Sequence, residues 1–410
     1  MRCRLCLAVL LCMAMAMPSV FAGQITGVYV SGLRRTQPRV IETPLQRFIG
    51  LEADDIDINE VHAIVGDLGV LEPLAIEILY DYYGHGKILA VTVRERWSIL
   101  GMPFFTVSSR GWLVGGGVAD TNAFGLRNMM ILAGAYGSNE WFAMAMFIAT
   151  PNAPGDFGLM LAAPFGSATT EHTEQTGKDV LRRFDTIRIS PAIGLSYSLT
   201  EWLTPGIRFS YNYIAMRDSD NAIDAPLRGV QSFAVSPNVE IRQSLWDGYL
   251  RSENFVALEY YYGIVFGGDN VQRLSLRTAF NQTIVPGFRA TARGGFVFST
   301  RSATPFFESG PVFGINILSA NYSARNYAGL SLGLERYLFR FSHGTVSVAA
   351  AYQGVFSRGP LLPGNQFDHG PAATLQLYFK RLAVPGIGLG GAYNVGRNSF
   401  QFAFNIGMFF

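Results

Sequence analysis

The sequence predicts a transmembrane β-barrel of about sixteen antiparallel strands, preceded by one small α+β domain. Charged residues make up only 15% of the 410 residues, well below the roughly 25% of soluble domains. Glycine and phenylalanine are abundant, yet no apolar run after residue 22 is long enough for a membrane-spanning helix. In lipid, only helices and closed barrels satisfy every backbone polar group, so this combination indicates a barrel.

The first 22 residues have the pattern of a secretory signal peptide. Arg2 and Arg4 form a basic start, residues 5–17 form a short apolar stretch, and Val20-Phe21-Ala22 fits a cleavage site. An uncleaved anchor and a lipoprotein site at Cys12 are the alternatives. All three cysteines lie in this segment, so the exported chain would have no disulfide, thiolate metal site or cysteine nucleophile.

Residues 24–96 have the pattern of a compact α+β domain with the order strand, helix, helix, strand, strand. Residues 25–30 alternate as a strand. Helical spacing follows Pro38 and recurs over residues 57–68, and a glycine stops each helix. Residues 74–80 and 88–93 alternate as the last two strands. The apolar residues expected on the buried helix faces are Val40, Ile41, Leu45, Phe48, Ile49, Ile58, Val61, Ile64, Val65 and Leu68.

From Trp97 onward, short segments of alternating hydrophobicity follow one another, separated by Gly, Pro, Asn and Asp. Side chains on a strand alternate between faces, so each segment has one face for lipid and one for a wet lumen. In the last segment Phe400 and Phe402 share one face, and Gln401 lies on the other. A soluble β-sandwich would also alternate but would carry far more charge. The segments begin near residues 98, 112, 129, 141, 156, 186, 205, 232, 254, 271, 287, 327, 345, 371, 386 and 398.

The connections between these segments fall into two classes. Those near 125–128, 151–155, 200–204, 285–287 and 341–344 are tight, whereas those over 166–185, 217–230, 300–326 and 357–370 are long, polar or irregular. Short periplasmic turns and long surface loops are the expected asymmetry of outer-membrane barrels. An even strand count then places both ends of the barrel chain on the periplasmic side.

Two groups of residues carry a pattern known from other proteins. The first comprises residues 30–36, 49–51, 68–71 and 91–96; the second, near the second barrel strand, comprises Asp120, Asn122, Phe124 and Gly125. The first group resembles a POTRA domain, the periplasmic module of the BamA/TamA superfamily of outer-membrane assembly proteins. The second is similar to that family's Asp-x-Asn-x-Phe-Gly signature. The resemblance implies one POTRA-like domain over 24–96, a barrel over 97–410, and a C-terminal sorting signal ending in Phe410.

The longest late connection ends in Arg325-Asn326-Tyr327, which is similar to the family's Arg-Gly-aromatic latch, a loop that folds back into the lumen. The aspartate that relatives carry for the latch arginine is missing, since Gln353 stands in that stretch. Glu335 alternates with the apolar residues of the strand after the loop, so its side chain should face the lumen. We therefore expect Arg325 to pair with Glu335. Ordinary solvated pore residues without a latch are the alternative. The other arginines expected to line the lumen are Arg273, Arg277, Arg289 and Arg293.

The sequence predicts neither catalysis nor a cofactor. Residues 329–333 match the nucleophile-elbow pattern but lie inside an alternating strand. Residues 386–391 contain the dinucleotide-fingerprint spacing, but no helix follows them. The five histidines show no metal-ligand spacing, and a net charge of +2 argues against a nucleic-acid partner.

The resemblance implies a protein of the bacterial outer membrane that assists the insertion or assembly of other outer-membrane proteins. Client polypeptides would bind the POTRA-like domain in the periplasm, lipid would surround the barrel, and periplasmic or lipoprotein accessory proteins would be further partners. Two alternatives stay open. One is a polypeptide transporter or solute pore of the two-partner-secretion type, and the other is a surface antigen without a transport role.

Overall fold

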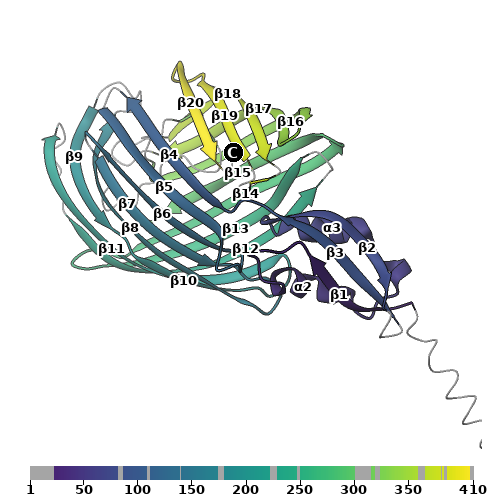
Figure 1. Ribbon diagram of the computed structural model, residues 1–410. Helices are drawn as coiled ribbons and strands as arrows, with labels where there is room; N and C mark the ends of the chain where they lie inside the picture. Colours follow the sequence, from purple (N-terminus) through teal and green to yellow (C-terminus); the bar gives the residue numbers. More distant parts are fainter. Residues whose placement is uncertain are drawn as a thin grey trace, which may run out of the picture. The chain divides into compact units, whose positions relative to one another are not determined.

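The computed structural model describes residues 23–81, 86–108, 111–138, 140–173, 180–221, 229–246, 250–300, 315–318, 324–358, 365–379, 381–382 and 386–406 (Figure 1). The chain divides into two units. The first is Met1–Arg96 with Phe124–Arg127, and the second is Trp97–Ala123 with Asn128–Phe410. No helix among the described residues is long and apolar enough to cross a membrane.

The first unit is a three-stranded sheet with helices. Its elements are β1 (Ile25–Ser31), α2 (Arg39–Leu45), η1 (Gln46–Phe48), η2 (Ala53–Asp55), α3 (Ile58–Asp67), β2 (Leu71–Tyr80) and β3 (Lys87–Glu95). The predicted small α+β region is therefore confirmed. β3 is the central strand, parallel to β1 and antiparallel to β2. The side chains of Val40, Ile41, Val61 and Val65 are fully buried, as their helical spacing predicts.

Two apolar residues of this unit are more exposed than predicted. Ile49 is 46% exposed because it follows η1 with an extended backbone and no longer lies on a helix face. Ile58 is 38% exposed because it is the first residue of α3, next to the capping residue Asp57. The Asp57 carboxylate accepts the Asn59 amide at 2.8 Å and so satisfies one donor of the helix start.

The carboxylate of Glu95, at the end of β3, fixes the segment that follows β1. Its Oε1 accepts the backbone amides of Arg34, Arg35 and Thr36 at 2.9, 2.8 and 2.6 Å. Partial burial alone would raise the pKa of Glu95, but these hydrogen bonds outweigh it and hold the pKa below its ordinary value. Gly32 precedes this segment with φ of 93°, and a Cβ there would lie 1.9 Å from the Val93 carbonyl oxygen.

The second unit is one large antiparallel sheet. Its strands are β4 (Ile99–Ser108), β5 (Gly111–Ala123), β6 (Asn128–Gly137), β7 (Glu140–Ala149), β8 (Phe157–Thr173), β9 (Val180–Ile189), β10 (Ala192–Tyr197), β11 (Leu203–Asn221), β12 (Val230–Trp246), β13 (Arg251–Val265), β14 (Val271–Val285), β15 (Phe288–Ser299), β16 (Asn326–Phe341), β17 (Gly344–Arg358), β18 (Asn365–Phe379), β19 (Gly386–Asn394) and β20 (Ser399–Ile406). Successive strands are neighbours, and β20 neighbours β4, which closes the sheet into a barrel.

The barrel has sixteen strand positions. The sheet contains 17 strands among the described residues, but β9 and β10 both pair with β8 and with β11. They are two parts of one strand, interrupted at Ser190 and Pro191. Most of the sixteen predicted segments begin within three residues of an observed strand. The predicted transmembrane barrel fold is confirmed.

The connections are short at one end of the barrel, as predicted, but their lengths vary at the other end, where only two residues separate β4 from β5 and β6 from β7. The turns at 124–127, 286–287 and 342–343 are short, whereas 300–325 separates β15 from β16. The predicted long loop 166–185 is largely strand, because β8 extends to 173 and β9 begins at 180. The predicted loop 217–230 is strand only in its first part, because β11 extends to 221. Strand ends that project beyond lipid can be polar on both faces, so their alternation is lost although their pairing continues.

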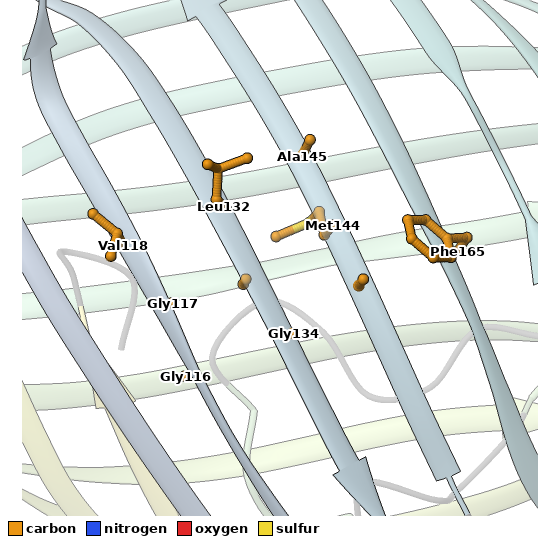
Figure 2. A pocket seen from close by; sticks show the side chains of 10 residues that line it. Gly116, Gly117, Val118, Leu132, Gly134, Met144, Ala145 and Phe165 are labelled. Carbon is orange, nitrogen blue, oxygen red and sulfur yellow. The ribbon is translucent and has the colours of Figure 1, made fainter.

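The outer face of the barrel is apolar. Ile187, Leu195, Leu332 and Phe402, all predicted to face lipid, are 49, 48, 54 and 71% exposed. A shallow groove crosses this face where the cross-strand neighbours Gly116, Gly134 and Ala143 of β5, β6 and β7 carry little or no side chain. In Figure 2, Leu132 and Phe165 stand beside this groove. The groove is part of the outward face.

Candidate functional site

A segment of the long β15–β16 connection lies inside the barrel. Ile315, Ile317 and Leu318 are 4, 0 and 6% exposed and pack with residues of four neighbouring strands. These residues, all on inward faces, are Val297 of β15, Tyr327 of β16, Val355 of β17 and Ala392 of β19. Phe298, next to Val297 in β15, is 56% exposed and faces outward. Because consecutive side chains of a strand point to opposite faces, Val297 faces the lumen. We call residues 315–318 the lumenal segment.

A glycine in β16 makes room for the lumenal segment. An ideal Cβ built on Gly329 would lie 2.4 Å from Cδ1 of Ile315 and 3.4 Å from the Val355 side chain. Any side chain larger than hydrogen would therefore displace Ile315. Gly329 has an ordinary strand conformation, so its role here is close approach rather than an unusual φ.

Polar side chains from three strands hold the backbone of the lumenal segment. Oε1 of Gln353 accepts the amide of Asn316 at 2.8 Å. Nδ2 of Asn394 donates to the carbonyl oxygen of Ile317 at 3.2 Å and to Oδ1 of Asp368 at 3.0 Å. Gln353 is 3% exposed, and Asp368 and Asn394 are fully buried. The segment is thus bound through its main chain, so its own side chains leave few polar signals in the sequence.

Asp368 is in turn held by an arginine from the β19–β20 turn. Nε of Arg397 donates to Oδ1 of Asp368 at 2.8 Å, and its Nη2 donates to Oδ2 at 3.2 Å. The amide of Arg397 also donates to Oδ1 of Asn394 at 3.1 Å. This bidentate pair fixes Asp368, which orients Asn394 toward the lumenal segment.

The expected pairing of Arg325 with Glu335 is wrong. The guanidinium of Arg325 donates to the carbonyl oxygens of Ser299, at 3.4 Å, and Thr300. Ten residues of extended chain separate Arg325 from Glu335, which is about 30 Å along β16 and far beyond the reach of an arginine side chain. The other two residues of the expected latch, Asn326 and Tyr327, do not contact Glu335 in the described part of the chain. Oδ1 of Asn326 accepts the Ser299 amide at 2.7 Å, and Tyr327 packs against the lumenal segment.

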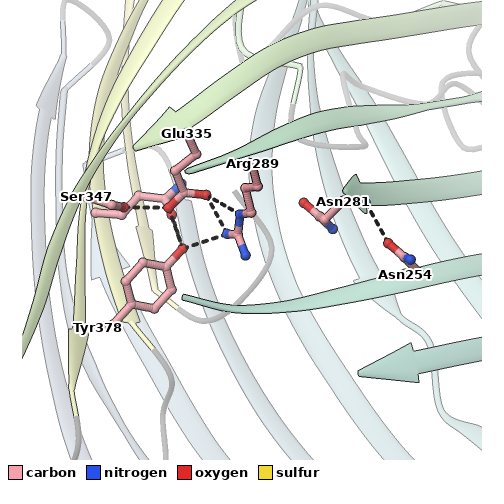
Figure 3. Close-up of polar contacts among 7 residues, drawn as sticks. Asn254, Asn281, Arg289, Glu335, Ser347 and Tyr378 are labelled. Atoms are coloured by element: carbon pink, nitrogen blue, oxygen red, sulfur yellow. Dashed lines mark hydrogen bonds and ion pairs between the residues drawn. The ribbon is translucent and has the colours of Figure 1, made fainter. Parts of the chain in front are cut away.

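Glu335 pairs instead with Arg289, one of the four arginines expected in the lumen. Arg289 donates through Nε at 2.9 Å and also through Nη2. The hydroxyl of Tyr378 donates to Glu335 at 2.9 Å, and Ser347 donates to the same carboxylate oxygen. Figure 3 shows these four side chains converging from β15, β16, β17 and β18. The cluster joins four consecutive strands on the lumen face.

The signature near the second barrel strand forms a tight turn. Oδ1 of Asp120 accepts the hydroxyl of Ser98 and the amide of Asn122, both at 3.0 Å. Phe124 and Gly125 both have positive φ, 61° and 69°. A Cβ at Gly125 would lie 2.2 Å from the carbonyl oxygen of Arg35. Glycine is therefore needed at this position for both its conformation and its close approach. Phe410, the predicted sorting signal, and residues 1–22 lie outside the described residues.

Asp368, Asn394 and Arg397 were not singled out from the sequence. The sequence does contain one indication of Asp368. Its neighbours Phe367 and His369 lie on the outward face of the strand, so the alternation places the Asp368 carboxylate on the lumen face. The sequence pattern marks Gln353 only as the residue that stands where relatives carry an aspartate. In the structure, Gln353 binds the lumenal segment itself.

The fold and this inward-bound loop define an outer-membrane type of β-barrel with an N-terminal α+β unit. No protein-family model and no curated protein match the sequence. Among solved structures, CdiB from Escherichia coli matches with a TM-score of 0.62 and 14% identity, over 94% of this chain and 75% of that one.

CdiB from Acinetobacter baumannii matches with a TM-score of 0.59 and 10% identity, over 94% of this chain and 73% of that one. BamA from Haemophilus ducreyi lacking POTRA domains 1–3 matches with 0.50 and 11%, over 93% and 83%. The chain therefore shares the fold of these CdiB and BamA structures, which agrees with the resemblance noted in the sequence.

Proposed function

We propose that this protein is an outer-membrane barrel that inserts polypeptides into the membrane or exports them across it. The observation that carries the proposal is the lumenal segment, a short stretch of the protein's own chain held against the inner wall of the barrel. The side chains of Gln353 and Asn394 bind its backbone, and its own Ile315 side chain lies against Gly329. Such a segment closes the lumen at rest and can be released without unfolding the barrel.

The first unit supports a polypeptide as the ligand. β2 pairs with β3 on one side only, so its other edge offers main-chain donors and acceptors to an extended client segment. Leu74, Leu79 and Tyr80 of β2 are 54, 47 and 73% exposed, which would add apolar contacts to such a strand. The unit would work in the periplasm, as the expected signal peptide implies.

Insertion and export remain the two candidate activities, since the fold is shared with BamA and with CdiB alike. A closing segment inside the lumen favours export through the barrel. The edge strand of the first unit serves either activity. A surface antigen without transport would have no use for a segment held by buried polar side chains on several strands.

A disulfide between the lumenal segment and β16 tests the proposal. All three natural cysteines lie within the first twelve residues, so Ile315→Cys with Gly329→Cys would create an isolated pair in the barrel. A Cβ at Gly329 lies 2.4 Å from Ile315 Cδ1, so the two Cβ atoms are within about 5 Å, close to disulfide geometry. The single variant Ile315→Cys and the reduced double variant are the matched controls.

In cells, the oxidised double variant should lose the activity, and a reductant should restore it. Outer-membrane protein levels report insertion, and proteins released to the medium report export. If export alone stops, the barrel works as a transporter. Full activity of the oxidised protein in both measurements would refute the idea that release of the lumenal segment is needed.

A further inference from the structure

We propose that the lumen wall formed by β14 and β15 binds a small oxyanion of the phosphate type. Three arginines make the site: Arg273 and Arg277 of β14, and Arg293 of β15. The site adjoins the lumenal segment, since Ser275, between the two β14 arginines, pairs with Val297. A small anion is a different ligand from a polypeptide, so this inference goes beyond the proposed function.

The register places these three arginines on one patch of the inner wall. Arg273 and Arg277 are four residues apart on β14, so both face the lumen. Arg277 pairs with Gly295, and Arg293 pairs with Ala279, which makes Arg277 and Arg293 diagonal neighbours. Diagonal Cβ atoms in an antiparallel sheet are about 7–8 Å apart. Two arginine side chains at that separation can reach one anion from both sides.

The carboxylates of this wall are already used. Glu259 is the acidic residue nearest in register, opposite Ser275, between the two β14 arginines. Both of its oxygens accept Nη2 of Arg208, at 2.6 and 2.7 Å. Glu335 is bound by Arg289. Five arginines and two glutamates on this wall leave three positive charges, and none of Arg273, Arg277 and Arg293 has an ion pair in the described part of the chain.

Arg273 and Arg277 differ in what surrounds them. The guanidinium of Arg273 lies 5.0 Å from the ring centre of Tyr261, and its Nε is buried without a hydrogen-bond partner among the described residues. Arg277 is exposed on the inner wall. Arg293 lies within electrostatic range of both members of the Arg289–Glu335 pair, whose charges offset one another. Uncompensated guanidinium groups in a confined space are costly unless an anion neutralises them.

An oxyanion fits these donors better than a halide does. A guanidinium presents parallel N–H groups that match two oxygens of a phosphate-type ion. The guanidinium of Arg273 lies over the ring of Tyr261, which fixes its position on the wall. A phosphate would also be excluded from Glu259 by like charge, which places it toward Arg277 and Arg293.

The test is calorimetric titration of inorganic phosphate into the full-length protein in detergent micelles. The double variant Arg277→Gln/Arg293→Gln should bind phosphate at least about tenfold more weakly, because two charge-assisted contacts are lost. Arg336→Gln is the matched control for the single variant Arg277→Gln, because it too removes one positive charge, from an exposed, outward position of β16. The control should bind like the unmodified protein.

Absence of phosphate binding by the unmodified protein would overturn the inference, and so would an equal loss in the control. The single variant Arg277→Gln, at an exposed position, guards against misfolding of the double variant and should bind severalfold more weakly. In planar bilayers, conductance through the unmodified protein should be anion-selective, and the double variant should shift the reversal potential toward cation selectivity. Unchanged selectivity would count against a site in the conducting path.

Discussion

Arg289 of β15 and Glu335 of β16 occupy directly paired positions, and their side chains are only 3 and 1% exposed. Each removes the cost of burying the other, and Tyr378 and Ser347 complete the hydrogen bonding of the carboxylate. With these two residues, the pair ties together β15, β16, β17 and β18 on the lumen side of the barrel. One of these strands, β16, follows the long loop.

Replacing Glu335 with Ala should destabilise the barrel by about 3–5 kcal/mol, since it leaves the Arg289 guanidinium buried without its carboxylate. The double variant Glu335→Ala/Arg289→Ala should lose less than the sum of the two single changes. Guanidinium-induced unfolding in detergent micelles measures this, with Arg336→Ala as a surface control. Strictly additive losses would show that the two residues are not coupled.

Asp368→Ala should release the lumenal segment, whereas Arg325→Ala should not. Asp368 holds both Asn394 and Arg397, and Asn394 binds the carbonyl oxygen of Ile317. Arg325 contacts only main-chain oxygens at the end of β15 among the contacts given above. Single-channel conductance and sensitivity to large antibiotics should rise in the first variant alone. The opposite ranking would restore a latch role to Arg325.

Glu95→Gln should weaken the first unit at neutral pH and remove part of its acid sensitivity. The pKa of Glu95 is below its ordinary value of 4.5 in the folded chain. Its contribution is therefore fully present above 4.5 and is lost as the pH falls through the lower, folded pKa. The hydrogen bonds to a charged acceptor suggest a loss of about 2 kcal/mol at pH 7.

Hydrogen exchange of the first unit, measured in the full-length protein from pH 7 down to pH 3, separates the two effects. The unmodified protein should lose protection of residues 31–36 on acidification, and Glu95→Gln should show little further loss. A parallel acid response in both proteins would assign the sensitivity to other groups.

Proline scanning of β2 should locate the edge that binds clients. Successive amides of a strand point to opposite sides, so one of Glu77 and Ile78 donates toward β3 and the other toward the free edge. Proline at the free-edge position removes one donor for a client and should reduce client cross-linking while the unit stays folded. Proline at the other position should unfold the sheet. Undiminished cross-linking in a folded variant would exclude strand addition at β2.

The sequence alone determined the strands and their faces. A strand in lipid must be apolar on one side and can be polar on the other, so residues such as Leu332 and Phe402 reveal their orientation within a few positions of local sequence. The POTRA-like pattern could also be recognised from the sequence, because Gly32 and Glu95 lie in short motifs at the ends of β1 and β3. The strand ends at 166–173 and 217–221 escaped prediction, since outside lipid the same pairing needs no apolar face.

Only the tertiary structure decided which lumen residues meet. The partner of Glu335 is set by the register of β15 against β16, and a shift of two residues preserves every inward and outward face while changing every pair. The contact of Ile315 with Gly329, and the support of Ile317 by Asn394 and Asp368, join segments up to 77 residues apart. The pairing of β15 through β19 brings these segments together on one part of the inner wall, and alternation along one strand contains no information about which residues of other strands lie beside it.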